Sequence, residues 1–500
     1  MDPLPSLLSC LPILSVTLLL SIFAWRSRRV KTQNFPPGPP ILPIIGNLHQ
    51  IGGLAHRSLW QLSKRYGPLM HLQLGSVPAV AISSAKIAEM VLKTHDLDFC
   101  GRPDLVSYRT VSYNFLDVAF APYGEGWRQM RKVCTLELFS SKRVQSFRFI
   151  REEEVNHLVG NISKSCQWRG VVNLSEMLFS LTNNVTCRAA LGKSYQVGDG
   201  ERSRFHQVLA EGGELSVAFF VADYFPSLGW VDVLTGKQGR LRKVFLDLDG
   251  FYEEVIEEHL NPSRSETLEQ EDFVDVLIKV QKELGLTRDH IKAVLMNILF
   301  GGTDSSSTVM EWTMTELMKN KKVLKKAQEE VRRVAAGKAK VEEYDVNQLH
   351  YLKSVIKETL RLHPPAPLLV PHATTRDCKV YGYEIPAKTR VFVNVFAIGR
   401  DPESWDSPED FIPERFSDDS IDHKGSNFEL IPFGAGRRGC PGINLGMVIV
   451  ELALANLLYA FDWDFPCGWS EDEEDENEAG GIAMHRRSPL LLVPKAHISS

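Results

Sequence analysis

The stretch Phe433-Gly-Ala-Gly-Arg-Arg-Gly-Cys-Pro-Gly442 carries the strongest pattern in this chain. Three glycines precede a single cysteine, Cys440, and an apolar run with helical spacing follows from Leu445 to Leu458. The N–H groups and the dipole at the start of such a helix stabilise negative charge on sulfur, which favours a thiolate. The glycines let the backbone pass close to a flat group, and Arg438 is suited to pair with carboxylates. A lone buried cysteine is usually inert packing, so Cys440 stands out through these neighbours.

At this point the chain resembles the cytochrome P-450 superfamily. The family pattern F-x-x-G-x-R-x-C-x-G is met by Phe433, Gly436, Arg438, Cys440 and Gly442. In that family a cysteine thiolate holds haem iron and pushes electron density toward O–O cleavage. The resemblance implies haem b (iron protoporphyrin IX) as the cofactor and Cys440 as the axial iron ligand. It also implies cofactor contacts near the sulfur by Phe433, Gly434 and Gly442. Arg438 would pair with a haem propionate.

A second pattern, Gly301-Gly-Thr-Asp-Ser-Ser-Ser307, lies in the middle of a helix predicted over residues 287–319. Glycines cost about 1 kcal/mol each in a helix, and hydroxyls can bond back to the preceding turn. Taken alone, the segment therefore predicts a helix break or a loop. It is also similar to the family's oxygen-binding groove, which implies that Asp304 and Ser305 relay protons to dioxygen. Ser305 replaces the usual threonine and lacks the methyl group that restricts its rotamer, so we expect looser coupling of electrons to product.

Glu358 and Arg361 share one face of a helix predicted over residues 349–362. Such a pair is most often a solvated surface contact. The resemblance adds Arg415, in the segment Pro413-Glu-Arg-Phe416, and implies that the three side chains form a buried network. This network would support the haem-binding loop and take no part in the chemistry.

Trp127 and Arg131 are four residues apart and share a helical face. The family pairs residues of this pattern with a haem propionate. His372 stands where relatives commonly carry arginine for the other propionate. A histidine is able to donate the same bond, although its charge near neutral pH depends on its surroundings. The alternative is an ordinary surface histidine.

Residues 3–25 contain no charged side chain, and as a helix they span about 34 Å, enough to cross a bilayer. They are followed by four basic residues, Arg26, Arg28, Arg29 and Lys31. A cleaved signal peptide is the alternative, but it carries positive charge ahead of its apolar core. Basic residues after the core hold that flank in the cytosol. We therefore expect a single-pass anchor in the endoplasmic reticulum membrane, a basic and proline-rich hinge over residues 26–40, and a cytosolic catalytic domain over residues 41–500.

Composition is consistent with a globular body. Apolar residues make up 44% and charged residues 24% of the 500 positions, which is enough to build a sizeable core. The eight cysteines are scattered and form no C-x-x-C pair, which argues against a disulfide framework or a zinc module. The net charge of −5 gives no reason to expect nucleic acid as a partner.

Residues 69–83 and about 378–395 alternate like short strands, whereas about 85–360 follow mostly the helical period. The acidic run 471–478 is typical of a solvated loop. The chain is thus predicted to be mainly α with small β-sheets. It would adopt the cytochrome P-450 fold, a single large helical haem domain, plus one N-terminal transmembrane helix.

The resemblance covers the whole chain and is nearest to the plant microsomal branch. It implies a monooxygenase that inserts one oxygen atom from dioxygen into a small lipophilic substrate such as a terpenoid, alkaloid or phenolic. No flavin or nicotinamide motif is visible, so electrons would come from an NADPH-dependent flavoprotein reductase. Two alternatives stay open. One is a haem-thiolate isomerase or dehydratase that needs no reductase, and the other is a non-catalytic, membrane-tethered haem binder.

Overall fold

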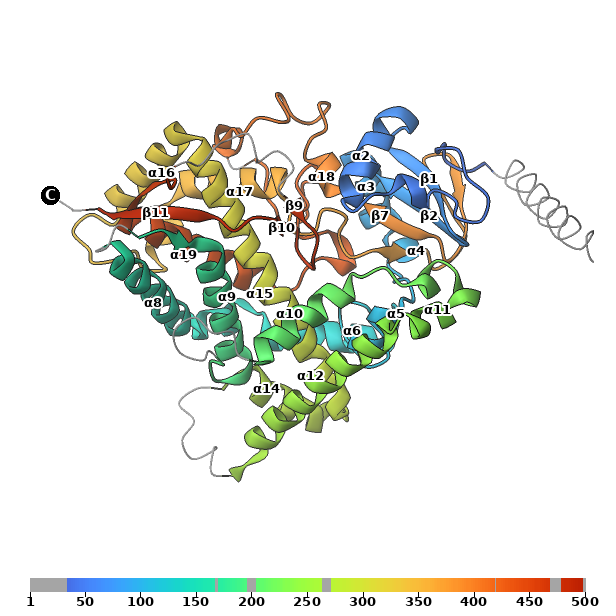
Figure 1. The fold of residues 1–500 in the computed structure, drawn as a ribbon, viewed down its shortest axis with the longest axis horizontal. Helices are drawn as coiled ribbons and strands as arrows, with labels where there is room; N and C mark the ends of the chain where they lie inside the picture. The colour runs from blue at the N-terminus through green and yellow to red at the C-terminus, as the bar shows by residue number, and fades with distance from the viewer. Residues whose placement is uncertain are drawn as a thin grey trace, which may run out of the picture.

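The computed structural model describes most of the chain outside the N-terminal segment. The described residues are 34–166, 170–195, 204–262, 271–418, 420–467 and 478–497. The predicted transmembrane segment 3–25 and residues 26–33 of the predicted hinge 26–40 therefore lie outside them. Figure 1 shows a helical body with the four-stranded sheet near the N-terminal side.

Helices make up the bulk of the molecule, as predicted. The longer ones are α2 (Ala55–Tyr66), α6 (Glu125–Val133), α8 (Arg148–Cys166), α9 (Leu174–Leu191), α10 (Arg204–Ser216), α12 (Lys237–Leu260), α14 (Phe273–Leu284), α15 (Arg288–Lys319), α16 (Lys321–Val334), α17 (His350–Leu362) and α19 (Ile443–Ala460). The shorter ones are α3 (Ala85–Glu89), α4 (Asp96–Phe99), α5 (Val106–Val111), α7 (Ser141–Ser146), α11 (Trp230–Leu234) and α18 (Val395–Ile398). Two 3₁₀ turns matter for the site, η7 (Pro413–Phe416) and η8 (Gly436–Arg438).

The strands of the described residues form four small sheets. The largest has the order β1-β2-β7-β4, in which β2 and β7 run parallel and the other neighbours antiparallel. Its strands are β1 (Leu69–Leu74), β2 (Val77–Ile82), β4 (His372–Ala373) and β7 (Arg390–Val393). The others are β3 (Val172–Asn173), β5 (Cys378–Val380), β6 (Tyr383–Ile385), β8 (Phe461–Asp464), β9 (Glu478–Ala479), β10 (His485–Arg486) and β11 (Leu491–Ala496). Strands predicted near 69–83 and 378–395 are confirmed.

Helix α15 runs through the centre of the body, and it contacts α9, α17 and α19. It is one continuous helix from Arg288 to Lys319, so the interpretation of residues 301–307 as a break or loop was wrong. Close packing explains the difference. A Cβ on Gly302 would lie 3.1 Å from the Thr186 side chain of α9, so glycine permits the close approach of the two helices. Tertiary contacts here outweigh the weak helix propensity of the local sequence.

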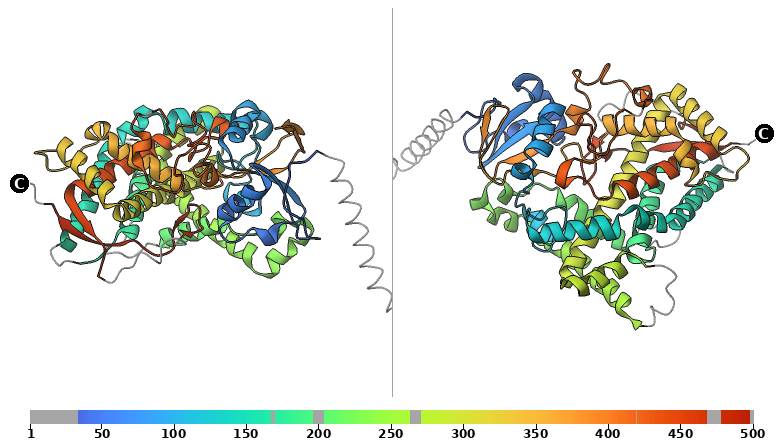
Figure 2. Two further views of the ribbon diagram at one scale, coloured as in Figure 1. Left: turned by 90° about the horizontal axis from the view of Figure 1, so that it is seen from above. Right: turned by 180° about the vertical axis from the view of Figure 1, so that it is seen from behind.

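Helix α19 follows the Cys440 loop and is apolar along its length. Among the described residues it is the one unbroken helix long and apolar enough to span a membrane, beside a bent pair, Gln207–Asp223 with Pro226–Leu234. Its side chains are nevertheless mostly buried by protein. Viewed from behind (Figure 2, right), it lies between α16 and α8, both of which it contacts. Its apolar sequence is therefore that of a core helix.

The predicted solvated loop at 471–478 needs a correction at its last residue. Residues 471–477 lie outside the described part of the chain, but Glu478 begins β9 and is only 4% exposed. Its carboxylate is 3.0 Å from Nε2 of His56 and 2.8 Å from Nε of Arg57. Burial raises the pKa of this carboxyl, but the bonds from His56 and Arg57 outweigh burial and hold the pKa well below its usual range. Specific partners therefore keep this acid charged inside the protein.

Candidate active site

The Cys440 loop is a tight hairpin-like turn ahead of α19. The backbone N–H of Cys440 donates to the carbonyl of Phe433 at 2.9 Å, which closes the loop. Gly434 and Gly436 have φ of 70° and 66°, in the left-handed region that favours glycine. A Cβ on Gly436 would also collide with the backbone carbonyl of Leu92. Two of the three glycines predicted for a close backbone approach, Gly434 and Gly436, are therefore required by the turn itself.

The thiol of Cys440 lies at the start of α19, as the sequence predicts. The backbone N–H of Gly442 donates to its sulfur, and the guanidinium of Arg131 is close enough to act on its charge. Burial raises the pKa of the thiol, while these two groups lower it. The side chain of Cys440 is nonetheless exposed. Cys440 is therefore accessible to a bound group while a backbone dipole and a charge act on its sulfur.

Arg438 and Trp127 lie against each other beside this loop. The guanidinium carbon of Arg438 is 4.2 Å from the centre of the Trp127 ring. Nε of Arg438 donates to the carbonyl of Cys100 at 2.8 Å, and Nη2 donates to that of Ala121 at 2.7 Å. The indole N–H of Trp127 already donates to the carbonyl of Val118 at 3.0 Å. Burial lowers the pKa of Arg438 to about 10.

A third arginine, Arg102, joins this group, and the sequence analysis missed it. Its Nε donates to the carbonyl of Ala119 at 2.9 Å, and its Nη1 donates to that of Val370 at 2.6 Å. Burial, followed by the charge of Arg438, lowers its pKa to about 9. No local pattern marks Arg102, because the chain brings it to Arg438 from a distant part of the sequence. Only the fold reveals the pair.

His372 is buried in β4, so its interpretation as a surface histidine was wrong. Its Nδ1 is 2.9 Å from the carbonyl of Phe99 and must carry the hydrogen, since a carbonyl only accepts. Burial and then the charge of Arg102 hold the pKa of His372 well below its usual value. The neutral ring therefore has only an acceptor left at Nε2. To donate to a propionate, it would have to take up a second proton.

The buried cations fit a dianionic cofactor. None of Arg102, Arg131 and Arg438 forms an ion pair with a carboxylate within the described part of the chain. Arg438 is buried and Arg102 and Arg131 are half-buried, and the charge of Asp117 offsets only part of the desolvation of Arg102 and Arg438. The two propionates of haem b would supply the missing negative charge. Together with the accessible thiol of Cys440, this arrangement has the donor set that haem requires.

The segment 301–307 is part of α15, and a serine side chain within it bonds back to the preceding turn. The hydroxyl of Ser305 donates to the carbonyl of Gly301 at 2.6 Å, four residues earlier. Gly301 is exposed in an otherwise largely buried helix, and a Cβ there would meet no atom within 4 Å. Gly301 thus borders open space beside the helix. Asp304 is half-buried on the following turn. The predicted hydroxyl and acid are therefore adjacent on a helix that is exposed at Gly301.

Glu358, Arg361 and Arg415 meet in one buried network. The carboxylate of Glu358 accepts two bonds of 2.7 Å from Arg361 and one of 3.0 Å from Nε of Arg415. Both members of the first pair are fully buried. The guanidinium groups also bind backbone carbonyls of the following loop, those of Pro408 and Asp410 from Arg361 and that of Ser407 from Arg415. The network therefore ties α17 to η7 and to the loop before it.

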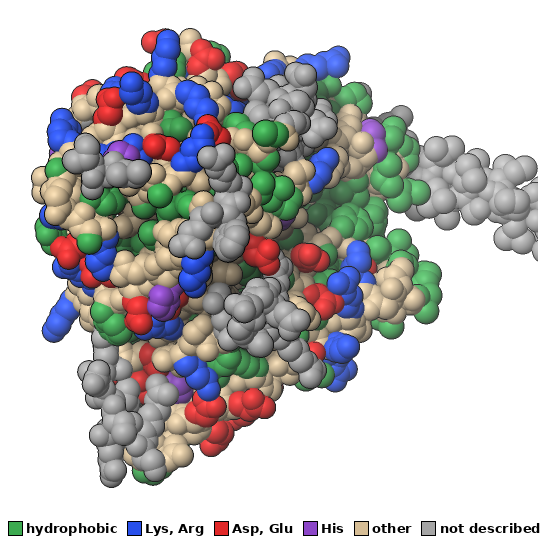
Figure 3. All heavy atoms as spheres, turned by 60° about the vertical axis from the view of Figure 1, so that its left-hand side comes forward, with side chains coloured by type: hydrophobic (Ala, Val, Ile, Leu, Met, Phe, Trp, Pro, Cys, Tyr) green, Lys and Arg blue, Asp and Glu red, His purple; other side chains and the backbone are tan. Residues whose placement is uncertain are grey.

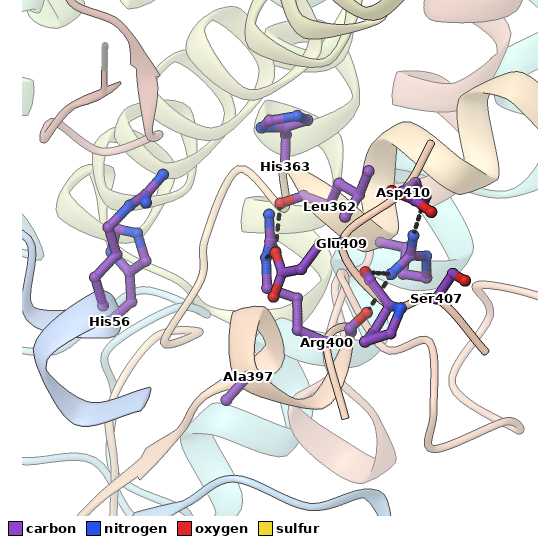
Figure 4. Close-up of polar contacts among 12 residues, drawn as sticks. His56, Leu362, His363, Ala397, Arg400, Ser407, Glu409 and Asp410 are labelled. Atoms are coloured by element: carbon purple, nitrogen blue, oxygen red, sulfur yellow. Dashed lines mark hydrogen bonds and ion pairs between the residues drawn. The ribbon is translucent and has the colours of Figure 1, made fainter. Parts of the chain in front are cut away.

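Figure 4 shows the neighbouring contacts of this region, with Ser407 and Asp410 on the loop and Arg400 between Leu362 and Glu409. Arg400 donates to the carbonyl of Leu362 at 2.8 Å and pairs with Glu409 at 3.1 Å. The loop is thus attached to the end of α17 by several independent bonds.

Comparison with known proteins agrees with this site. The cytochrome P450 family model matches residues 36–493. Cytochrome P450 71A1 of Persea americana is 53% identical over 461 residues, covering 91% of this chain and 92% of the relative. Strychnine-11-hydroxylase of Strychnos nux-vomica is 47% identical over 500 residues and covers 98% of both chains. A zebra fish cytochrome P450, solved with Abiraterone, superposes with a TM-score of 0.73 at 24% identity over 89% of this chain and 100% of the other.

The matches extend across nearly the whole described body, with full-length plant relatives at about half identity. Members of this family hold haem b through a thiolate, use dioxygen on lipophilic substrates and take electrons from a redox partner. The plant relatives are generally membrane-bound. The chain therefore belongs to the cytochrome P450 family and is a haem-dependent monooxygenase of the plant type.

Proposed function

We propose that this chain is a membrane-anchored monooxygenase in which the Cys440 thiolate holds the iron of haem b. It inserts one oxygen atom from dioxygen into a small lipophilic plant metabolite, a terpenoid, alkaloid or phenolic. Electrons reach it from NADPH through a flavoprotein reductase. The observation that carries the proposal is the Cys440 thiol, exposed at the start of α19 and contacted by the N–H of Gly442 and the charge of Arg131.

We assign the haem contacts as follows. Phe433, Gly434 and Gly442 contact the haem beside the sulfur, and Arg102, Arg131 and Arg438 face the propionates. Trp127 packs against Arg438 at the cofactor edge and is a weaker hydrogen-bond candidate, because its one N–H is committed to Val118. His372 is a weaker candidate for a propionate contact, because its Nδ1 hydrogen is committed to Phe99. Glu358, Arg361 and Arg415 hold the fold around the loop and take no part in the reaction.

The bound haem supplies the chemistry that splits dioxygen. The protein's part is to deliver protons on the groove side, and Ser305 and Asp304 are placed for this task. The Ser305 hydroxyl donates to the Gly301 carbonyl, so its oxygen keeps a lone pair for a proton from solvent or from Asp304. A positioned hydroxyl and acid of this kind form a short proton path.

Reconstitution of the full-length chain with plant reductase in microsomes tests the activity. Terpenoid, alkaloid and phenolic panels should yield at least one product heavier by one oxygen atom, with consumption of NADPH and dioxygen. Turnover of a peroxide substrate without reductase would instead favour the isomerase or dehydratase. A thiolate spectrum without turnover on any panel would favour the non-catalytic haem binder. The relative whose name is strychnine-11-hydroxylase makes the alkaloids the first panel to examine.

Substitution of Ser305 by alanine should uncouple the reaction. The variant loses the hydroxyl near Gly301. Proton delivery to dioxygen is therefore slower, while the supply of electrons from NADPH is unchanged. Product formed per NADPH should fall at least about tenfold, since positioned proton donors contribute about 10²–10⁴-fold. Hydrogen peroxide release and NADPH oxidation measure the effect. Ser305→Thr should keep or improve coupling.

Ser307→Ala is the matched control for this experiment. Its hydroxyl makes the same type of bond, to the carbonyl of Thr303 at 3.2 Å, within the same helix. It lies on a buried position and should leave coupling unchanged. Equal uncoupling by both alanine variants would contradict the role of Ser305.

We also propose that the body rests on the membrane to which residues 3–25 attach it. Two segments carry exposed apolar side chains, here called the apolar rim: Ile41, Leu42, Ile44, Ile45, Val217, Phe219, Trp230, Val233 and Leu234. The segments are neighbours. The N–H of Gly75 donates to the carbonyl of Ile45 at 3.2 Å, and the N–H of the next residue, Ser76, donates to the carbonyl of Tyr224 at 2.9 Å. Hydrophobic side chains gather at the right-hand end of Figure 3, near the described N-terminus. A patch of this kind suits a lipid surface.

Protease treatment of sealed microsomes tests the proposed topology. The body should be digested from outside. The chain has three Asn-x-Ser/Thr sequences that are acceptors for N-glycosylation in the lumen, at Asn161, Asn173 and Asn184, and none should carry a glycan. Asn184 is buried and donates to Glu154 at 3.0 Å, so a glycan there is incompatible with the fold. Protection of the body inside the vesicles would contradict a cytosolic orientation.

A further inference from the structure

The loop 117–121, between α5 and α6, is fastened to α15 through its backbone N–H groups. The amide oxygen of Asn297 accepts from Val118 and Ala119, each at 3.1 Å. The amide nitrogen of Asn297 donates to the carboxylate of Asp117 at 3.0 Å. That carboxylate also accepts from the N–H of Phe120 at 3.1 Å. One side chain of α15 therefore holds the loop by three hydrogen bonds.

The backbone carbonyls of the same loop accept hydrogen bonds from three side chains beside the Cys440 loop, here called the cation group: Arg102, Arg438 and Trp127. Val118 accepts from Trp127, Ala119 accepts from Arg102, and Ala121 accepts from Arg438 at 2.7 Å. The loop thus lies between two sets of partners, α15 on its N–H side and the proposed propionate contacts on its carbonyl side. A shift of the loop would move the indole and both guanidinium groups together.

Asn297 also lies close to the segment of α15 that begins at Gly301, the predicted oxygen-binding groove. It precedes Gly301 by four residues on α15, so the two share one face of the helix, one turn apart. The bonds from Asn297 therefore connect the groove at Gly301 to the cation group through a single short loop.

We propose that Asn297 is a positioning residue that sets the placement of the cofactor edge relative to the α15 groove. The inference rests on the proposed function, because it assumes that Trp127, Arg102 and Arg438 face the cofactor. Asn297 acts through loop 117–121 and touches no reacting atom. Its partner Asp117 is the acceptor that orients its amide, so that oxygen and nitrogen cannot exchange places.

The charge of Asp117 belongs to this arrangement. Burial raises the pKa of its carboxyl to about 6, and the amide of Asn297 opposes this. The charged or titratable groups that face it are Arg102 and Arg438 on the cation side and the Cys134 thiol after α6. A second carboxylate beside Asp117 would therefore be strongly disfavoured at neutral pH.

A charge-swap cycle tests the proposal in the full-length holoenzyme. Asn297→Asp places two buried carboxylates in contact while changing the side-chain size very little. The double variant Asn297→Asp/Asp117→Asn restores the bond between the two side chains with the groups exchanged, and Phe120 keeps one of its two acceptor oxygens at position 117. The amide now at position 117 accepts from Phe120 and donates to the carboxylate now at position 297, which accepts from Val118 and Ala119. Asp117→Asn alone completes the cycle. The readouts are the rate of haem transfer to apomyoglobin, the substrate-induced spin-state shift and product formed per NADPH.

In the Asn297→Asp variant, haem transfer should become about tenfold faster above neutral pH, the size expected when members of one polar network are uncoupled. The spin-state shift and the product per NADPH should fall in parallel. The double variant should return all three readouts to within about twofold of wild type. The buried Asn456, which binds both the N–H and the carbonyl of Val341, supplies the control for general destabilisation. Asn456→Asp should lower thermal stability and leave the spin-state shift unchanged.

The positioning role is overturned if the double variant is as impaired as Asn297→Asp, or if Asn456→Asp alters the spin-state shift by the same factor. The behaviour of the wild-type protein distinguishes a failure of this inference from a failure of the proposed function. If the wild-type protein binds haem and forms product but the double variant does not recover, only the role of Asn297 is overturned. A wild type that takes up no haem overturns both.

Discussion

Replacement of Cys440 by serine should remove the ferrous–carbonyl absorption of a thiolate-ligated haem and reduce product formation by at least about 10³-fold, the order of loss when a residue that performs chemistry is removed. A serine hydroxyl stays protonated near neutral pH and cannot give the iron the electron density that a thiolate gives. The N–H of Gly442 and the charge of Arg131, which stabilise negative charge on the sulfur, would have no anion to act on.

The control for this variant is Cys134→Ser. Cys134 is buried, and burial raises the pKa of its thiol to about 12, although Arg131 lowers it. It is therefore a second thiol that senses the same guanidinium but is unsuited to be an anion. The Cys134 variant should keep the thiolate absorption. A Cys440→Ser protein with wild-type absorption and turnover would refute the assignment of the iron ligand.

Substitution of Glu358 by glutamine should prevent accumulation of folded, haem-loaded protein. The neutral amide leaves the buried Arg361 without its charge partner, and breaking a buried ion pair in this way costs about 3–5 kcal/mol. A loss of this size is a large part of a typical stability of about 5–15 kcal/mol. Haem content per polypeptide and the midpoint of urea unfolding measure the effect.

Glu414→Gln is the matched control, one residue before Arg415 in η7. Glu414 pairs with Lys326 at 2.7 Å, but both side chains are about half exposed. A surface pair of this kind contributes about 0–1 kcal/mol, so the unfolding midpoint should barely move. If Glu358→Gln were as stable as Glu414→Gln, the network at the end of α17 would not support the fold as proposed.

Features that depend on short, contiguous stretches of sequence could be predicted. The Cys440 turn depends on glycines whose backbone conformation is local, and the strands at 69–83 follow their own alternation. Glu358 and Arg361 lie one turn apart on a helix, and a family pattern connects them to Arg415. In the structure these residues come together as expected.

Features that depend on distant parts of the chain could not be predicted. The glycines at 301 and 302 favour a break, but packing against Thr186 keeps α15 continuous. Glu478 belongs to an acidic run, yet His56 and Arg57 bury it. Arg102 has no local pattern. The partners Asp117 and Asn297 are 180 residues apart, so no periodicity relates them.

The group of Arg102, Arg131 and Arg438 has a consequence for how the protein matures. Like charges held together away from water repel each other, so the polypeptide without its prosthetic group carries an internal strain that binding relieves. A ligand that binds only the native state also stabilises it by mass action. The supply of haem during synthesis would therefore determine how much of the polypeptide escapes degradation. Iron-starved cells would contain less of the polypeptide, as well as less haem absorption.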